Sequence, residues 1–277
     1  MNTVISKSRQ HPMIIMVIAL VFYLIWFCAP ALVAGAAPGE GQGIDGAEDM
    51  VRQMIPEIGL VITILAFVAL LNGWHAMRIT TQLRKGWFWA LILPLVYVGI
   101  FLFLGYATLL ENELGLSAIP LQIFAPLIFT TFLVGVFEEF LFRGVVFNAF
   151  ERWRGTILAV IVSSILFGSM HYVNWAGGQP LGSTHIQVLH AGLAGILYAG
   201  LMLYTGSIWI PVLYHGLWDS TVTFFQTASS FSEETASVAA TDSDGSFVQY
   251  AVFGFEPMYG ALLVFLWWRS TRKKKTE

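Results

Sequence analysis

Residues 119–150 read IPLQIFAPLIFTTFLVGVFEEFLFRGVVFNAF, and this stretch decides the class of fold. A helix needs about 20 mostly apolar residues to cross a hydrocarbon core of about 30 Å, and the stretch exceeds that length. Its charged residues are confined to Glu138, Glu139 and Arg143. The stretch therefore predicts a transmembrane helix that carries ionisable side chains within the bilayer.

The rest of the chain repeats this apolar character. Of its 277 residues, 57% are hydrophobic and 11% are charged, so a water-soluble fold would lack the polar surface to cover its apolar mass. We predict an all-α fold, a polytopic transmembrane helical bundle of about eight spans, forming one domain over residues 1–277 with a central core at about 119–227. The apolar runs behind this prediction are residues 13–36, 57–77, 86–109, 119–150, 156–172, 186–204, 207–227 and 248–268.

The first run admits a second interpretation. The triplet Ala34-Gly35-Ala36 resembles a signal-peptide cleavage site, but the run is longer than the usual apolar region of about 7 to 15 residues, which favours a retained span. The run also contains the chain's single cysteine, Cys28, so an intramolecular disulfide and a thiolate metal cluster are both excluded.

The charges between the runs alternate in sign. Because cytoplasmic loops of membrane proteins are enriched in Lys and Arg, this alternation predicts that the N and C termini are both cytoplasmic. We expect an integral membrane protein, in the plasma (inner) membrane of a prokaryote. The basic clusters are Lys7 and Arg9; Arg78, Arg84 and Lys85; Arg152 and Arg154; and Arg269, Arg272 and Lys273 to Lys275, whereas the acidic segments hold Glu40 to Asp49, Glu111 and Glu113, and Glu233 to Asp244.

Ionisable residues remain inside the apolar runs after the loops are accounted for. An ionisable group within a bilayer is energetically expensive unless it is paired or hydrated, so each is a functional candidate by default. These residues are Glu138, Glu139, Arg143, His171, His215, Asp219 and Glu256.

Helical spacing pairs some of these residues. Glu139 and Arg143 lie four apart, hence on one face, which suits a buried ion pair. Glu138 points elsewhere and remains available for chemistry. His215 and Asp219 form a second pair four residues apart.

The turn at residues 152–155 predicts an antiparallel hairpin. Glu138 lies 17 residues before Gly155 and His171 lies 16 after it, so at about 1.5 Å per residue both rise roughly 25 Å from the turn. An acid and an imidazole at one height can share a water molecule, as general-base hydrolysis requires. If the turn is cytoplasmic, this site lies in the outer half of the membrane and opens away from the cytoplasm.

These motifs resemble those of the CAAX proteases and bacteriocin-processing enzymes, the Abi family of intramembrane glutamic endopeptidases. The family carries Glu-Glu-x-x-x-Arg, Phe-x-x-x-His and His-x-x-x-Asn or Asp on successive core helices. The resemblance covers about residues 119–227. The matching residues, in the same order, are Glu138-Glu139 with Arg143, Phe167 with His171, and His215 with Asp219.

The resemblance implies a role for each position. Glu138 and His171 would activate the attacking water, and His215 with the residue at position 219 would stabilise the oxyanion. Glu139 and Arg143 would support the site, with no metal or other cofactor. The implied substrate is a membrane-anchored protein or peptide tail, and no nucleic acid is expected as a partner.

One departure from the family pattern affects the chemistry. Prenyl-protein members typically have Asn where this chain has Asp219, and an ionised carboxylate has no hydrogen to donate to an oxyanion. Either Asp219 is protonated or it orients His215 so that the imidazole alone donates. We favour the second interpretation because the two residues are spaced for contact.

Two alternatives remain at this point. Glu138, His171 and His215 would also suffice as the three protein ligands of a catalytic zinc, although no HExxH helix is present. The other alternative is a protein without enzymatic activity, either a transporter or a membrane chaperone, in which the buried Glu and His residues form a proton relay.

The other ionisable residues are predicted to lie outside the chemistry. His185 and His190 are expected to line the outer mouth of the site. Glu256, beside Pro257, is expected to cap a broken or shortened eighth helix.

Overall fold

The computed structural model describes residues 11–34, 47–71, 73–111, 121–230 and 246–273. Within these ranges the regular structure is helical and contains no strand, so the predicted all-α class is confirmed. The helices are α2 (Pro12–Ala34), α3 (Ala47–Leu71), α4 (Trp89–Glu111), α5 (Leu121–Glu139), the π-helix η2 (Phe140–Val146), α6 (Phe147–Arg154), α7 (Thr156–Met170), α8 (Tyr172–Ala176), α9 (Leu181–Thr205), α10 (Trp209–Ser230) and α12 (Ser246–Lys273).

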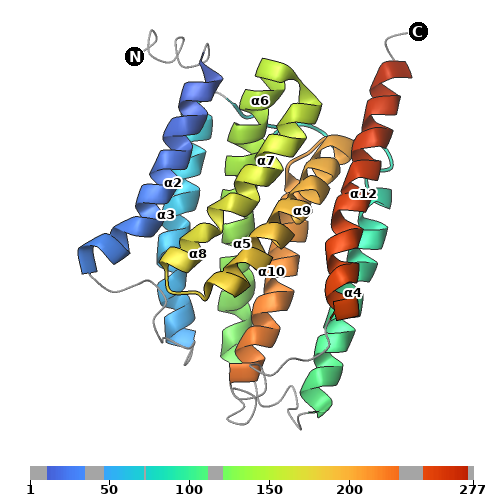
Figure 1. The fold of residues 1–277 in the computed structure, drawn as a ribbon. Helices are drawn as coiled ribbons and strands as arrows, with labels where there is room; N and C mark the ends of the chain where they lie inside the picture. Colours follow the sequence, from blue (N-terminus) through green and yellow to red (C-terminus); the bar gives the residue numbers. More distant parts are fainter. Residues whose placement is uncertain (1–10, 35–46, 72, 112–120, 231–245, 274–277) are drawn as a thin grey trace.

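The long helices stand side by side as a bundle (Figure 1). Each predicted apolar run falls on one of them, and the run at 119–150 is the continuous rod formed by α5, η2 and α6. Helix α2 contributes a shorter apolar stretch, Pro12–Phe27. Five helices of the described ranges are long and apolar enough to cross a membrane, over Met54–Leu71, Trp89–Leu110, Gln122–Arg154, Thr156–Ala176 and Leu181–Thr205.

The described basic connections gather at one end of the bundle. In Figure 1 the start of α2, the α6–α7 turn and the end of α12 all lie at the top. The segment 73–88 is attached to the same end, because Arg78 donates two hydrogen bonds of 3.0 Å to the Glu151 carboxylate of α6. Thr81 also donates to the carbonyl of Gly206, in the α9–α10 turn. This grouping agrees with the charge alternation that predicts a cytoplasmic end.

Small residues let α9 approach two neighbouring helices closely. A Cβ at Gly195 would lie 2.9 Å from the Cα of Ser164 on α7, and a Cβ at Gly200 would lie 2.6 Å from the carbonyl oxygen of Gly260 on α12. Both distances are too short for a side chain, so glycine is required at these crossings. Close approach through small residues is a common way for helices to pack in membranes.

The connection between α7 and α9 turns back inside the bundle. In Figure 1, α8 and the start of α9 lie about midway along its length, whereas α4, α5 and α10 continue further toward the lower end. His171 is the residue at which α7 ends and α8 begins. The second histidine of the motifs is therefore held within the bundle, away from its two ends.

The predicted break in the eighth helix is wrong. Helix α12 runs without interruption from Ser246 to Lys273 with Pro257 inside it. The Glu256 side chain does not cap a helix end: it is fully buried and faces His190 of α9. A proline inside a helix removes one backbone hydrogen bond, and neighbouring helices compensate for this in a packed bundle.

Several sequence predictions concern residues outside the described ranges. These are the basic residues Lys7 and Arg9, most of the proposed cleavage site at 34–36, and the acidic segment 231–245.

The orientation of the bundle can be tested by cysteine labelling. In a Cys28→Ala background, we expect an impermeant thiol reagent to label Ser237→Cys, in the acidic segment between α10 and α12, but not Arg152→Cys, at the basic turn. The physical reason is the cytoplasmic retention of basic loops. Permeabilised cells, in which both cysteines should react, provide the control. Labelling of Arg152→Cys alone in intact cells would reverse the orientation.

Candidate active site

The paired glutamates lie where the long rod changes its helical type. Glu138 and Glu139 are the last residues of α5, and Arg143 lies in the π-helix η2 that follows. The N–H of Phe147 bonds to the carbonyl of Phe142, five residues back. Single π-helical turns inside α-helices are frequent at functional sites. The whole segment 139–150 is buried, so every face of this part of the rod packs against protein.

Arg143 is a fully buried cation. Its Nη1 donates a hydrogen bond of 3.0 Å to Oε1 of Glu139, which confirms the predicted ion pair. The guanidinium carbon also lies 4.3 Å from the ring centre of Phe167 on α7 and 5.0 Å from that of Tyr198 on α9. Cation–π contacts of this kind are strongest when the cation is desolvated. Arg143 therefore connects α5 and η2 to two other helices.

The backbones of α5 and α10 meet at two glycines. A Cβ at Gly135 would lie 2.9 Å from the carbonyl oxygen of Val212, and a Cβ at Gly216 would lie 3.2 Å from the Cα of Phe132. Gly135 is one turn before the glutamate pair, and Gly216 immediately follows His215. The close crossing brings the imidazole of His215 within reach of the carboxylates on α5.

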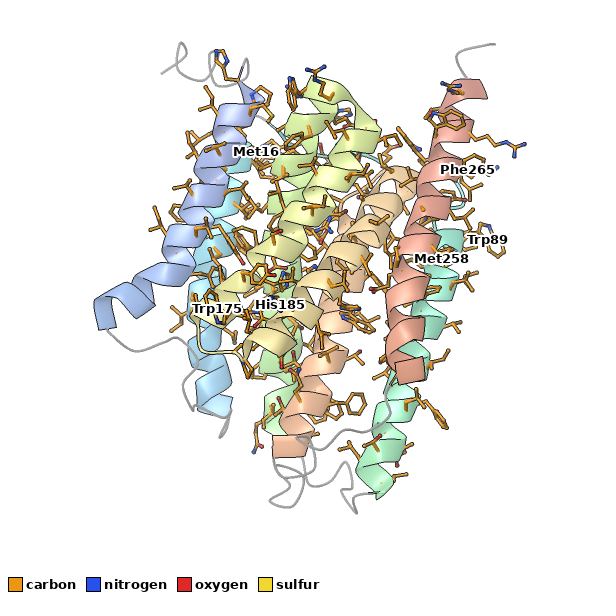
Figure 2. All side chains as sticks on the ribbon, viewed as in Figure 1. Met16, Trp89, Trp175, His185, Met258 and Phe265 are labelled. Atoms are coloured by element: carbon orange, nitrogen blue, oxygen red, sulfur yellow. The ribbon has the colours of Figure 1, made fainter. Side chains whose placement is uncertain are left out.

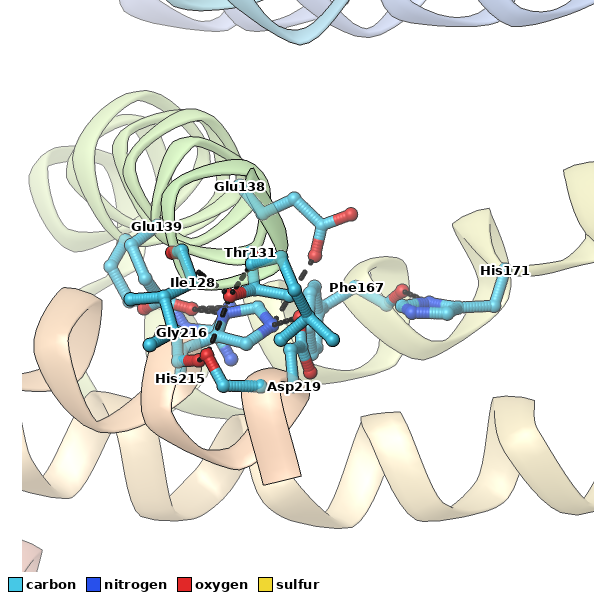
Figure 3. A network of polar contacts seen from close by, with 12 residues as sticks. Ile128, Thr131, Glu138, Glu139, Phe167, His171, His215, Gly216 and Asp219 are labelled. Atoms are coloured by element: carbon cyan, nitrogen blue, oxygen red, sulfur yellow. Dashed lines mark hydrogen bonds and ion pairs between the residues drawn. The ribbon is translucent and has the colours of Figure 1, made fainter. Parts of the chain in front are cut away.

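His215 is surrounded by three carboxylates (Figure 3). Its Nδ1 lies 3.0 Å from Oε1 of Glu139, the same oxygen that accepts from Arg143. Its Nε2 lies 3.3 Å from Oδ2 of Asp219, so the predicted contact along α10 is confirmed, and 3.7 Å from Oε2 of Glu138. The imidazole therefore has one nitrogen in a structural contact and the other directed at the groups predicted to be catalytic.

His171 approaches the site from the opposite side of Phe167. Its Nδ1 lies 3.0 Å from the carbonyl oxygen of Phe167, and the Phe167 ring contacts both imidazoles edge-on, at centroid distances of 5.1 Å to His171 and 5.7 Å to His215. Figure 3 shows His171 and Glu138 as separate groups. Among the described residues no direct hydrogen bond joins them. The two side chains instead line one cavity, which is compatible with the predicted shared water.

The cavity has a volume of about 610 Å³ and is enclosed by helices from across the sequence. Helices α2, α3, α5, α7, α8, α9 and α10 all contribute to its wall. This volume is typical of small-molecule and peptide-sized sites, at about 300 to 1,000 Å³. Its ionisable lining residues are Glu57, Glu138, His171, His190, His215 and Asp219.

Two of these residues were not predicted to lie in the cavity. His190 was expected at the outer mouth, yet it lines the cavity wall, with its Nε2 3.0 Å from Oε2 of the buried Glu256. His185 is not among the residues that line this cavity, and its ring contacts that of Tyr172 at a centroid distance of 5.7 Å. In the view of Figure 2, His185 lies near Trp175 of α8. Glu57 opens the second apolar run, so the sequence pattern places it at a span boundary. A helical wheel of α3 that treated Glu57 as a residue inside the span would have marked it as a candidate.

The Glu139–Arg143 pair generates a stability prediction. Arg143→Ala should lower stability by about 3 to 5 kcal/mol, because it leaves the Glu139 charge buried without its partner. Replacing both residues together, as Glu139→Leu with Arg143→Met, should be less destabilising than Arg143→Ala alone. Thermal melting of the purified proteins in detergent measures this order. An Arg143→Ala protein as stable as the parent would refute the role of the pair in stability.

Comparison with known proteins gives a family match for the segment that carries the three motifs. A search of curated proteins and of solved structures found no match. A scan against protein-family models matched residues 120–221 to "Rce1-like: Type II CAAX prenyl endopeptidase Rce1-like". The matched segment contains Glu138, Glu139, Arg143, His171, His215 and Asp219. Residues 120–221 therefore match the Rce1-like model, which is consistent with the resemblance of the motifs to the CAAX protease family.

Proposed function

We propose that this protein is an intramembrane endopeptidase that hydrolyses a peptide bond with a water molecule activated by Glu138 and His171. The observation that carries the proposal is that residues of all three motifs line one cavity between helices of a membrane bundle. Glu138, His171, His215 and Asp219 are separated in sequence but share this space. The substrate is a membrane-associated protein or peptide tail, because the cavity lies among helices apolar enough to span a membrane.

Glu138 is suited to act as the general base. Its carboxylate makes no hydrogen bond to Arg143, whose Nη1 is directed to Glu139. A water held between Glu138 and His171 would lose a proton to Glu138 as its oxygen bonds to the substrate carbonyl carbon. The same proton would then pass to the leaving amine as the carbon–nitrogen bond breaks, which returns Glu138 to its starting state.

His215 is suited to stabilise the oxyanion. Glu139 and Asp219 flank its two nitrogens, so two carboxylates can accept from an imidazole that carries hydrogen on both. The single Nε2–H, which Asp219 accepts in the resting site, would be shared with the oxygen of the tetrahedral intermediate as negative charge develops there. In this scheme Asp219 orients His215 and does not donate to the oxyanion itself. The Asp that replaces the usual Asn is thereby compatible with the mechanism.

A zinc-dependent mechanism fits the geometry less well. Among the described residues, no group of three or more His, Cys, Asp or Glu side chains is arranged to hold a metal ion. We therefore propose a glutamic-type mechanism without a metal.

The base assignment predicts the effect of one substitution. Glu138→Gln should fold and express like the parent yet lose about 10² to 10⁴ in rate, because it keeps the side-chain volume but removes the base. The measurement is cleavage of a membrane-anchored reporter protein by the purified variant in proteoliposomes.

Two comparisons make the result interpretable. Glu151→Gln, at the basic end of the bundle and away from the cavity, is the matched control and should cleave at the parental rate. Parental activity in Glu138→Gln would mean that another group is the base, and proton-coupled flux into liposomes without any peptide product would favour a transporter.

The metal-free mechanism makes a separate prediction. Treatment with a zinc chelator should leave the rate of the purified enzyme unchanged, and elemental analysis should find less than one zinc per active molecule. Loss of activity on chelation, restored by added zinc, would instead support ligation by Glu138, His171 and His215.

A further inference from the structure

A second, smaller cavity adjoins the candidate active site. It has a volume of about 340 Å³ and lies between α3, α5 and α10. It shares Glu57, Val134, Asp219 and Thr223 with the larger cavity, so the two spaces meet at these residues. A substrate bound at the catalytic groups therefore has a side pocket beside it.

The walls of this side pocket combine apolar surface with hydroxyl groups. Leu127 and Val134 supply the apolar part, and Thr130 and Thr131 lie between them on α5. The hydroxyl of Thr131 is engaged by Ser220 at 2.6 Å, whereas that of Thr130 is buried and has no hydrogen-bond partner within the described residues. Such a pocket can accommodate an aliphatic chain that ends in a polar group.

Glu57 places a carboxylate where the two cavities meet. The residue lies on α3 next to Pro56, which also lines the side pocket. In the described part of the structure, Glu57 forms no hydrogen bond and no ion pair. The nearby carboxylate Asp219 is engaged with His215, so Glu57 is the acid at this junction that the proposed mechanism does not use. A carboxylate among membrane helices is costly unless it is hydrated or paired, which leaves it suited to a cationic partner.

The surrounding charge favours such a partner. Three of the residues that line the two cavities are Glu57, Glu138 and Asp219, and none of the lining residues is Lys or Arg. The nearby cation Arg143 is fully buried behind the cavity wall and bonds to Glu139. Even with His215 protonated on both nitrogens, as proposed above, these three carboxylates outnumber the cation in the lining. A cleft with a net charge and low-dielectric walls concentrates ligands of the opposite sign.

We propose that Glu57 and the side pocket form a specificity subsite for a Lys or Arg side chain of the substrate, close to the scissile bond. The proposal rests on the proposed endopeptidase function and defines its substrate class more narrowly. The aliphatic part of the side chain lies along Leu127 and Val134, and its charged end meets the Glu57 carboxylate. Glu57 acts in selection and takes no part in bond cleavage.

The experiment compares matched peptides. Internally quenched peptides that end in an apolar helix are reconstituted with the enzyme in phosphatidylcholine liposomes, and the cut is located by mass spectrometry. Each of the three residues on either side of the cut is then varied between Lys, Arg, Gln and norleucine. The variants are Glu57→Gln, which keeps the shape, and Glu57→Asp, which keeps the charge.

We expect the parent to prefer Lys or Arg over norleucine at one position by about tenfold or more in kcat/KM, the range for a buried charge-assisted contact. Glu57→Gln should reduce this ratio to within about twofold of unity, and Glu57→Asp should retain most of it.

Other results would overturn the subsite. A parent enzyme that cleaves without any preference for a cation refutes it even if no Glu57 variant folds, and so does a preference that persists in Glu57→Gln. In both cases, loss of cleavage in Glu138→Gln would still support the proposed endopeptidase function. A parent that cleaves none of the peptides would overturn both proposals.

Discussion

The site depends on one carboxylate oxygen that accepts two hydrogen bonds. Oε1 of Glu139 receives one from Arg143 and lies 3.0 Å from Nδ1 of His215, so α5, η2 and α10 are joined at a single atom. The aromatic rings around Arg143 extend the connection to α7 and α9. Groups this deeply buried are stable only when each charge is compensated, so loss of any one member leaves the others unpaired. The geometry of the candidate site and the packing of the helices thus depend on the same contacts.

Local spacing explains what the sequence could predict. The pairs Glu139–Arg143 and His215–Asp219 are each four residues apart, so helix geometry alone brings them together, and the structure confirms both contacts. The helical class followed from the lengths of the apolar runs. The expectation that Glu138 and His171 share one site followed from their equal distances to the turn at residues 152–155. The roles of these residues stay predictions until they are tested by activity.

Contacts between distant helices could not be predicted in this way. The approach of His215 to Glu139 depends on the close crossing at Gly135 and Gly216, and neither glycine reveals its partner in one sequence. The His190–Glu256 pair joins α9 to α12, and nothing in the sequence indicates that the two residues meet. His190 was expected at the outer mouth and Glu256 at the end of a broken helix. The π-helix η2 gave no signal at all, because its sequence is apolar in the same way as the α-helical turns beside it.

The residues that line the cavity come from a longer part of the chain than the segment matched by the family model. Tyr23 and Phe27 on α2 and Glu57 on α3 line it, yet all three precede the matched segment 120–221. Glu256 on α12 follows that segment and contacts the lining residue His190. The proposed selectivity residue Glu57 therefore lies outside the segment that holds the proposed catalytic residues. Under this proposal, substitutions in α2 or α3 would change which substrate fits without altering the proposed catalytic residues. A common catalytic core can in this way acquire new substrates during evolution while its hydrolytic residues stay the same.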